Sequence, residues 1–279
     1  MRLATKHRDI DFLKKMARAI RVEILKMLTE AGSGHTGGSL SAADIVSALY
    51  FYKMRYNPKD PQWRERDRFI LSKGHAAPVL YAVLALSGYF DKQLLLTLRK
   101  LGSPLQGHPC SKKLPGVEIS TGSLGQGLSI ANGIAMGLKL DRLPSRVYCL
   151  VGDGEIQEGQ IWEAAMTASH YRLDNLCAII DNNGLQIDGH CSDVMGIEPI
   201  VQKWEAFGWY VIDIYGHDMR AIVDALDEAE SVTGRPTMVV ARTVKGKGVS
   251  FFEGKVEYHG IAPTKEELES ALRELEHYG

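Results

Sequence analysis

Cysteine is scarce in this sequence, and none of it is paired in a metal-binding or redox pattern. The four cysteines among 279 residues show no C-x-x-C spacing. Two of them, Cys149 and Cys177, fall inside apolar, strand-like runs, where a cysteine usually acts as a small core residue. We therefore expect no disulfide framework, and a reduced, cytoplasmic setting.

Long apolar runs and an excess of charge are also missing. No uninterrupted apolar stretch could span a membrane, and the charged N-terminus lacks the apolar core of a signal peptide. The formal net charge is -1, so the chain has no bulk attraction to nucleic acid or to an anionic membrane. Internal repeats, low-complexity segments and domain linkers are absent as well. These absences leave an ordinary globular protein, in keeping with 45% hydrophobic and 24% charged residues.

What the chain does contain is a regular alternation of strand-like and helix-like segments. Apolar runs predict strands at 68–71, 147–151, 176–180, 210–214 and 236–242. Apolar residues at three- and four-residue steps predict a helix at 9–30, and further helices are expected at 41–52, 76–86, 91–100, 197–207 and 219–230. Ser41 is the expected N-cap of its helix, after a glycine-rich loop at 31–38, and Thr264 with Glu267 has capping-box spacing. The pattern predicts one α/β domain over 1–279, with a doubly wound, mainly parallel sheet and helices on both faces.

The stretch 151–189 carries the first candidate site. One strand ends at Gly152-Asp153-Gly154, and after a helix the next strand ends at Asp181-Asn182-Asn183-Gly184. In a parallel unit both strand ends lie on one edge of the sheet, where open α/β sheets bind ligands. Asp153, Asn183 and a carbonyl such as that of Leu185 are then hard oxygen donors that suit Mg²⁺ or Ca²⁺ with a phosphorylated ligand. The alternative is a strand-end aspartate that only caps the following helix.

Histidines next to glycines form the second candidate site, and each lies in a loop near the end of a predicted element: His35, His75, His108 and His259. Such a set could surround a polyhydroxylated or phosphorylated ligand and exchange protons with it near neutral pH. The spacing is not that of a zinc site. The alternative is four surface or core histidines, which is how we interpret the others, His7, His170, His190, His217 and His277.

Two further groups of charged residues have both a functional and a plain interpretation. Lys245 and Lys247 alternate with glycine after a strand and could contact phosphate, or could belong to a solvated loop. Glu158 and Glu163 flank the first turn of the helix after Asp153. Their apolar neighbours favour burial, which would require a partner or a shifted pKa.

At these residues the chain resembles the N-terminal, diphosphate-binding half of transketolase. The resemblance covers nearly the whole chain through motifs in the same order: SGHTGGSLSAADI, LSKGHAAPVLY, QGHP, STGSLGQGLSIANG, GDGEIQEGQIWEA, DNNGLQIDG, KGKGVSFFE and YHGIAP. It implies transfer of a two-carbon ketol unit from a ketose phosphate to an aldose phosphate. It also implies thiamine diphosphate with Mg²⁺ as cofactors, with Ca²⁺ or Mn²⁺ as substitutes.

The resemblance also implies a role for each candidate residue. Asp153, Asn183 and the Leu185 carbonyl hold the metal, and the diphosphate lies near Gly154, His75, Lys245 and His259. The rings of the cofactor are approached by Gly122, Ser123, Leu124 and Ile187. His35 and His108 line the channel for the donor sugar, and His259 is expected to act with them. Glu158 and Glu163 belong to a carboxylate network that joins paired active sites.

The departure from the family is length. Transketolases continue into a pyrimidine-binding domain that carries the glutamate which activates the cofactor, and we see no candidate for it here. The resemblance therefore implies the N-terminal half of a split transketolase, which works with a separate C-terminal chain in an α2β2 heterotetramer. Alternatives are one chain of another thiamine diphosphate enzyme, for an unusual sugar or a 2-oxo acid, and a cofactor-binding half-protein without turnover.

Overall fold

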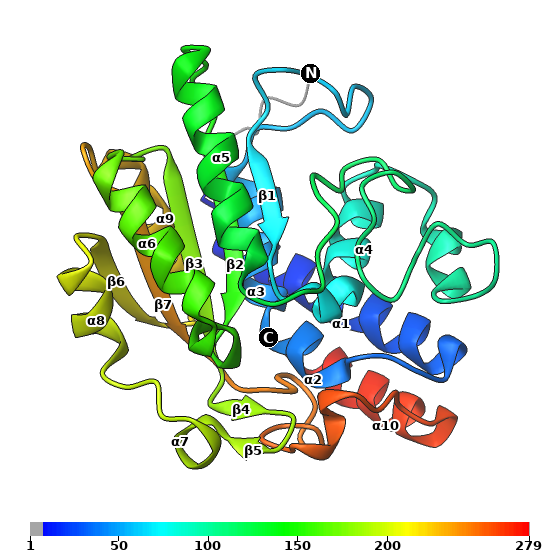
Figure 1. Ribbon diagram of the computed structural model, residues 1–279. Helices are drawn as coiled ribbons and strands as arrows, with labels where there is room; N and C mark the ends of the chain where they lie inside the picture. The colour runs from blue at the N-terminus through cyan, green and yellow to red at the C-terminus, as the bar shows by residue number, and fades with distance from the viewer. Residues whose placement is uncertain (1–7, 279) are drawn as a thin grey trace.

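A five-stranded parallel sheet forms the centre of the computed structural model, which describes residues 8–278 (Figure 1). Its strands follow the order β1 (Arg68–Leu71), β2 (Val147–Gly152), β3 (Leu176–Asn182), β7 (Thr237–Arg242) and β6 (Tyr210–Tyr215). All four strand pairings are parallel, as the alternation along the sequence predicts. His7 lies outside the described residues.

Each face of the sheet is covered by helices, because successive strand side chains point to opposite sides. On one face Val147, Cys149 and Val151 pack under α5 (Gln126–Leu140), α6 (Gly159–His170) and α8 (Ile200–Ala206). On the other, Tyr148 and Leu150 pack under α3 (Ala43–Ala48), α4 (Ala77–Leu86) and α9 (Met219–Ser231). The doubly wound fold is confirmed, and Cys149 and Cys177 are fully buried in its core.

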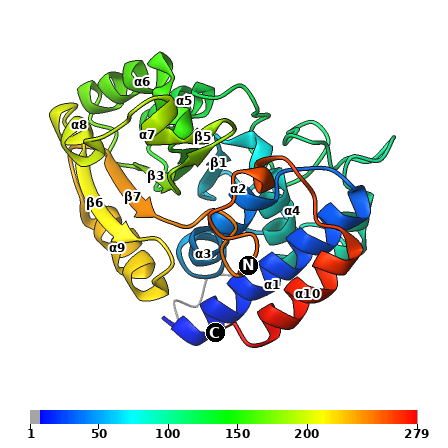
Figure 2. The same ribbon diagram turned by 90° about the horizontal axis from the view of Figure 1, so that it is seen from below.

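Two long amphipathic helices form a further layer outside α3 and α4 (Figure 2). Helix α1 (Ile10–Ala31) begins at the N-cap Asp9 and ends at Gly32, whose φ of 62° glycine adopts without a steric penalty. Helix α10 (Lys265–Glu276) packs on α1 and has the predicted capping box of Thr264 and Glu267. Among residues 8–278, no helix is both long and apolar enough to cross a bilayer.

The segment between α1 and β1 differs from the sequence-based expectation. Thr36–Ser41 forms helix α2, so Gly37 and Gly38 are helical, and Ser41 ends this helix instead of capping the next one. The Ser41 hydroxyl donates to the Asp181 carboxylate at 2.6 Å. The prediction for Ser41 was therefore wrong, because a buried carboxylate from a distant strand needs this hydroxyl. After α3 the chain continues as a π-helical turn, Leu49–Lys53.

The other elements are short. A 3-10 helix, Lys92–Thr97, replaces the longer helix predicted at 91–100, and further 3-10 turns lie at Gly74–Ala76, Gly154–Gln157 and Glu257–His259. A hairpin of β4 (Leu185–Gln186) and β5 (Gly189–His190) precedes α7 (Cys191–Val194). Most of these turns lie beside the carboxyl ends of the central strands, where they shape a cleft.

Candidate functional site

A cleft of about 450 Å³ lies at the carboxyl edge of the sheet. Four adjacent strands, β1, β2, β3 and β7, are each followed by a polar residue that lines the cleft. In the order of the strands these residues are Lys73, Asp153, Asn183 and Lys245. The cleft contains every residue predicted for the site except Ser123 and Glu163: His35, His75, His108, His259, Gly122, Leu124, Gly154, Glu158, Ile187, Lys245, Asp153, Asn183 and Leu185. Segments from both ends of the chain thus meet at one place.

The acidic turn after β2 is held by backbone amides. Asp153 is 2% exposed, and its carboxylate accepts hydrogen bonds from the amides of Gly154 (2.8 Å) and Gly184. Burial, together with the nearby Asp181 carboxylate, raises the pKa of Asp153 to about 6. The bond to Gly184 ties the turn after β2 to the turn after β3, which brings Asp153 close to Asn183.

The oxygen donors expected for a metal converge in this place. The Asn183 side-chain oxygen accepts from the Leu185 amide at 3.2 Å, and the Leu185 carbonyl accepts from Lys245 Nζ at 2.9 Å. One carboxylate and two neutral oxygens match the preference of Mg²⁺ and Ca²⁺ for hard ligands. The donor set present therefore fits a divalent metal, with Lys245 positioned to contact anionic groups of its ligand.

Three histidines and Lys245 form a cluster beside these donors. The ring centroids of His35, His75 and His259 are separated by 5.1 to 5.4 Å, and Lys245 Nζ lies 2.8 Å from His259 Nδ1. His35 Nδ1 is buried and has no hydrogen-bond partner within the described chain. An unpaired polar atom in the wall of a cleft is costly unless a ligand or water satisfies it.

These histidines are neutral at physiological pH. Burial and neighbouring cations lower the pKa of His35 to about 4, of His259 to about 3 and of His75 to about 2. Burial also lowers the pKa of Lys245 to about 8. The four histidines predicted for the site line one cleft, and their pKa values in the free protein are lowered. Neutral imidazoles can each donate one hydrogen bond and accept another.

Gly122 and His108 are in direct contact at the mouth of the cleft. Gly122 has a φ of 154°, and a Cβ at this position would lie 3.0 Å from His108 Cδ2. Burial and Arg99 lower the pKa of His108. Glycine therefore allows the loop before α5 to approach the histidine closely.

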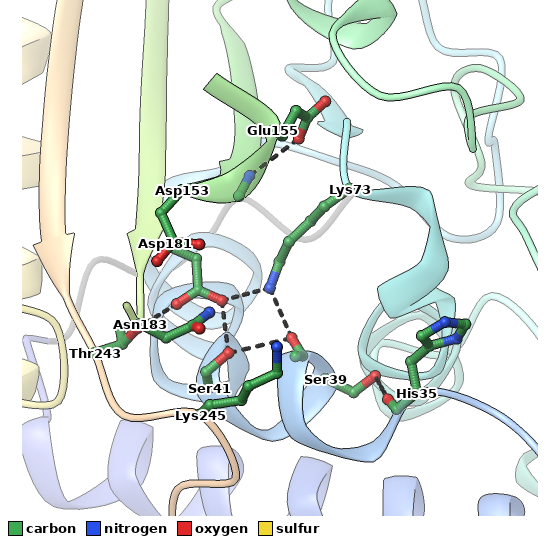
Figure 3. Close-up of polar contacts among 12 residues, drawn as sticks. His35, Ser39, Ser41, Lys73, Asp153, Glu155, Asp181, Asn183, Thr243 and Lys245 are labelled. Atoms are coloured by element: carbon green, nitrogen blue, oxygen red, sulfur yellow. Dashed lines mark hydrogen bonds and ion pairs between the residues drawn. The ribbon is translucent and has the colours of Figure 1, made fainter. Parts of the chain in front are cut away.

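A set of buried charges lies beside His35 at the strand ends, and we call it the floor: Lys73, Glu155 and Asp181 (Figure 3). Lys73 pairs with Asp181 and donates to the Gly38 carbonyl at 2.7 Å, while Ser41 and Thr243 also donate to Asp181. Burial raises the pKa of Asp181, but Lys73 and these hydroxyls outweigh it and hold the pKa below its usual value.

Glu155 closes the floor on the other side. Its carboxylate accepts from the amides of Gly125 (2.9 Å) and Gly152 (3.0 Å) and from Ser72, while burial raises its pKa. The sequence alone suggested no role for Lys73, Glu155 or Asp181. A signal was present for Asp181, because an aspartate that directly follows five buried apolar residues of a strand needs a partner.

Some predicted residues differ from the expectation in their burial or their position. Glu158 and Glu163 are exposed in this chain, so the prediction of their burial was wrong, and the buried glutamate of this segment is Glu155. Glu163 lies outside the apolar face of α6, which is formed by Ile161, Ala164, Ala165 and Ala168, whereas Glu158 is the N-cap of α6 and lines the cleft. Ser123 is exposed and outside the cleft, and Lys247 pairs with Glu253 at 3.1 Å instead of lining it.

A parallel sheet with oxygen donors, a lysine and histidines at its carboxyl edge defines an α/β domain with a polar ligand site at the strand ends. The family profile "Transketolase, thiamine diphosphate binding domain" matches residues 12–278. The chain belongs to this family, as an N-terminal transketolase section. Its class of reaction is ketol transfer that depends on thiamine diphosphate.

Curated relatives and solved structures agree with this assignment. A 6-deoxy-6-sulfo-D-fructose transketolase subunit of Clostridium sp. (strain MSTE9) is 47% identical over 96% of this chain and 97% of its own length. Human transketolase is 42% identical over 94% of this chain, but over only 42% of its own length. The crystal structure of Campylobacter jejuni transketolase superposes with a TM-score of 0.90 at 36% identity, over 95% of this chain and 43% of that one.

Proposed function

We propose that this chain is the N-terminal subunit of a two-chain transketolase that moves a two-carbon ketol unit between sugar phosphates in the cytoplasm, as in the pentose phosphate pathway. The observation that carries the proposal is the convergence of Asp153, Asn183, the Leu185 carbonyl and Lys245 at one edge of the sheet. Three oxygen donors beside a lysine suit a diphosphate that is bound through Mg²⁺, with Ca²⁺ or Mn²⁺ as substitutes.

The proposed roles follow from position in the cleft. Asp153, Asn183 and Leu185 hold the metal, while Lys245, His75 and the Gly154 segment face the diphosphate. Thiamine diphosphate, when bound, supplies the carbanion chemistry that this chain lacks. The cofactor rings lie toward Gly122, Leu124 and Ile187 in the cleft, and toward Ser123, which is in the same loop but outside the cleft.

The histidines nearest the cleft mouth serve the sugar in this proposal. His35, His108 and His259 hydrogen-bond the hydroxyls and carbonyl oxygen of the donor, and their lowered pKa values keep them neutral for this task. A neutral imidazole can donate to a carbonyl oxygen through one nitrogen and accept from a hydroxyl through the other. His35 Nδ1, which has no partner in the described chain, is available for such a bond.

A separate partner chain is the second part of the proposal. The relatives that this chain matches over nearly their whole length include one of the subunits of apulose-4-phosphate transketolase from Phocaeicola vulgatus, 41% identical over 96% of this chain and 95% of its own length. Their naming as subunits supports a partner that contributes the pyrimidine-binding and C-terminal domains, in an α2β2 assembly. The segment 122–137 and the exposed Glu158 and Glu163 are the surfaces we assign to it, with the two glutamates forming the carboxylate network between paired sites.

Co-purification from the native source tests the partner. A tagged copy of this chain is expected to bring down one transketolase C-terminal chain in equal amount. The reconstituted pair is then assayed with thiamine diphosphate and Mg²⁺, alongside each chain alone. The proposal is supported if the pair turns over substrate and neither chain does so alone. Full turnover by this chain alone contradicts the two-chain assignment.

The sugar has a second candidate. Because the 47%-identical relative is named for 6-deoxy-6-sulfo-D-fructose, a sulfonated ketose is an alternative donor to a ketose phosphate. Both donors carry an anionic group far from the reacting carbons, so comparison of kcat/KM for the phosphate and the sulfonate decides between them. A higher value for the sulfonate would replace the sugar phosphate in the proposal and leave the cofactor chemistry unchanged.

A further inference from the structure

The loop that carries Lys245 is fixed at two points outside the cleft. In this lysine loop, residues 243–248, the Val244 amide donates to His217 Nε2 at 2.8 Å, and the Lys247 carbonyl accepts from Arg21 Nε at 2.9 Å. Val244 precedes Lys245 by one residue and Lys247 follows it by two. The backbone on both sides of the lysine is therefore bound to side chains from other parts of the fold.

The two anchoring side chains are joined by a carboxylate. Asp44 accepts from both terminal nitrogens of Arg21, with Nη1 at 3.1 Å, and from His217 Nδ1 at 2.7 Å. Arg21 lies on α1, Asp44 on α3, and His217 in the turn between β6 and α9. The exposed fractions of the three side chains are 0%, 8% and 3%, so water does not compete for these bonds.

The hydrogen bonds determine which ring nitrogen of His217 carries the proton. Its Nε2 accepts a backbone N–H and so carries no proton, which leaves the proton on Nδ1 as the donor to Asp44. A carboxylate that orients an imidazole in this way fixes both the ring and its tautomer. In this case the oriented nitrogen holds a backbone amide of the lysine loop.

Close packing shows that the loop has little freedom between the anchors. Gly248 has a φ of 100°, and a Cβ there would lie 2.9 Å from Arg21 Cδ. The Gly246 amide donates to the Gly37 carbonyl at 3.0 Å, and a Cβ on Gly37 would lie 2.8 Å from Lys245 Cγ. The glycines let the loop lie directly against Arg21 and α2, and the buried triad then determines its position.

We propose that Arg21, Asp44 and His217 are positioning residues for Lys245, and that they set the affinity for the diphosphate of the cofactor without touching it. The inference rests on the proposed contact of Lys245 with that diphosphate. Lys245 Nζ is held between the Leu185 carbonyl and His259 Nδ1. A small shift of the loop would therefore move the lysine charge away from its position beside the proposed metal donors. The triad thus links the outer helix layer to the cofactor site.

Two amide variants of His217 test the roles of its two ring nitrogens separately. Asparagine (H217N) reaches Asp44 but not the Val244 amide, whereas glutamine (H217Q) places its side-chain oxygen near the position of Nε2. Calorimetric titration of thiamine diphosphate and Mg²⁺ into the chain with its partner gives Kd for each. We expect Kd to rise about tenfold or more for H217N and to stay within about threefold for H217Q.

Tyr52→Phe is the matched control for a general loss of packing. It removes a hydrogen bond of 2.7 Å from the hydroxyl of a buried tyrosine to Asp227, between the π-helical turn and α9. Its Kd is expected to stay within about twofold of wild type. Equal Kd values for H217N, H217Q and wild type would overturn the proposal.

A double-mutant cycle with Lys245→Ala tests whether His217 acts through the lysine. If it does, H217N adds less than about twofold to Kd once Lys245 is gone. The same increase with and without Lys245 would show a merely structural role and contradict the inference. Absence of cofactor binding by the wild-type pair would instead contradict the proposed function itself.

Discussion

The floor of the cleft and its histidines differ in how completely the protein satisfies them. Asp181 in the floor accepts from Lys73, Ser41 and Thr243, and Glu155 accepts from two backbone amides and Ser72. In the histidine cluster, by contrast, His35 Nδ1 is buried with no partner in the described chain.

This difference indicates that the floor charges stabilise the fold, whereas the histidines of the same cleft bind a ligand. Buried charges that are paired and hydrogen-bonded within the chain hold the strand ends together. Neutral imidazoles with free nitrogens contribute little to folding but can bind a polar ligand. We therefore expect floor substitutions to change the free energy of unfolding, and substitutions of the ligand-facing groups to change binding or turnover.

Asp181→Leu is expected to have the largest effect. It leaves Lys73 as an unpaired buried cation, which destabilises the fold by about 3–5 kcal/mol. Urea unfolding of the purified chain measures this. The control is Asp141→Asn, which disrupts an exposed pair with Arg64 and is expected to cost less than about 1 kcal/mol.

A companion variant sharpens this prediction. Replacing both charges, in Lys73→Met with Asp181→Leu, removes the unpaired cation and is expected to restore much of the lost stability. If Asp181→Leu unfolds at the same urea concentration as Asp141→Asn, the floor does not have the structural role assigned here.

Asp153→Asn is expected to act on binding instead. Loss of the only carboxylate among the proposed metal donors weakens metal-dependent binding of thiamine diphosphate by about 100-fold. Titration of the cofactor at fixed Mg²⁺ measures this, and Asp141→Asn again serves as the control. Unchanged affinity in Asp153→Asn would remove this residue from the metal site.

Cofactor affinity is expected to depend on pH on both sides of neutrality. The pKa of Asp153 is raised to about 6, so below this pH its carboxylate is protonated and no longer serves as a metal ligand. The affinity for the cofactor then falls about tenfold per pH unit. The pKa of Lys245 is lowered to about 8, so above this pH the lysine loses its positive charge and the affinity for the cofactor falls again. Titrations from pH 5 to 9 measure both limbs, and the acid limb should be absent in Asp153→Asn.

His35→Ala is expected to have the smallest effect. Loss of one hydrogen bond to the sugar lowers kcat/KM by about two- to tenfold, while the free energy of unfolding stays within about 0.5 kcal/mol. Steady-state kinetics of the reconstituted pair and urea unfolding of the chain are compared. A loss of stability as large as that of Asp181→Leu would erase the distinction between the floor and the histidines.

Much of the cleft could be predicted because it depends on local patterns. Asp153 and Asn183 each follow an apolar strand, and parallel strands bring their carboxyl ends to one edge. The same logic placed Lys245 after β7. The histidines were recognisable by their shared position beside glycines, although their lowered pKa values were not, since those depend on burial and on cations from other segments.

The missed residues depend on partners that are distant in sequence. Lys73 and Asp181 are 108 positions apart, and Arg21 and Lys247 are 226 apart, so no local pattern indicates that they meet. Ser41 looked like an N-cap because serine satisfies free amides at helix starts, but in the fold the Asp181 carboxylate takes its hydroxyl. His217 was interpreted as structural or surface, and it is buried between Asp44 and Val244.

The acidic turn at Asp153 shows what the sequence determined by itself. Alternating strands and helices, with oxygen donors directly after two strands, specify a parallel α/β sheet with a ligand site at its carboxyl edge. Only the tertiary structure decided which charges support that site and which face a ligand. The physical reason is that burial and pairing, which set the pKa of Asp153 and the position of Lys245, arise from segments that meet only in the folded chain.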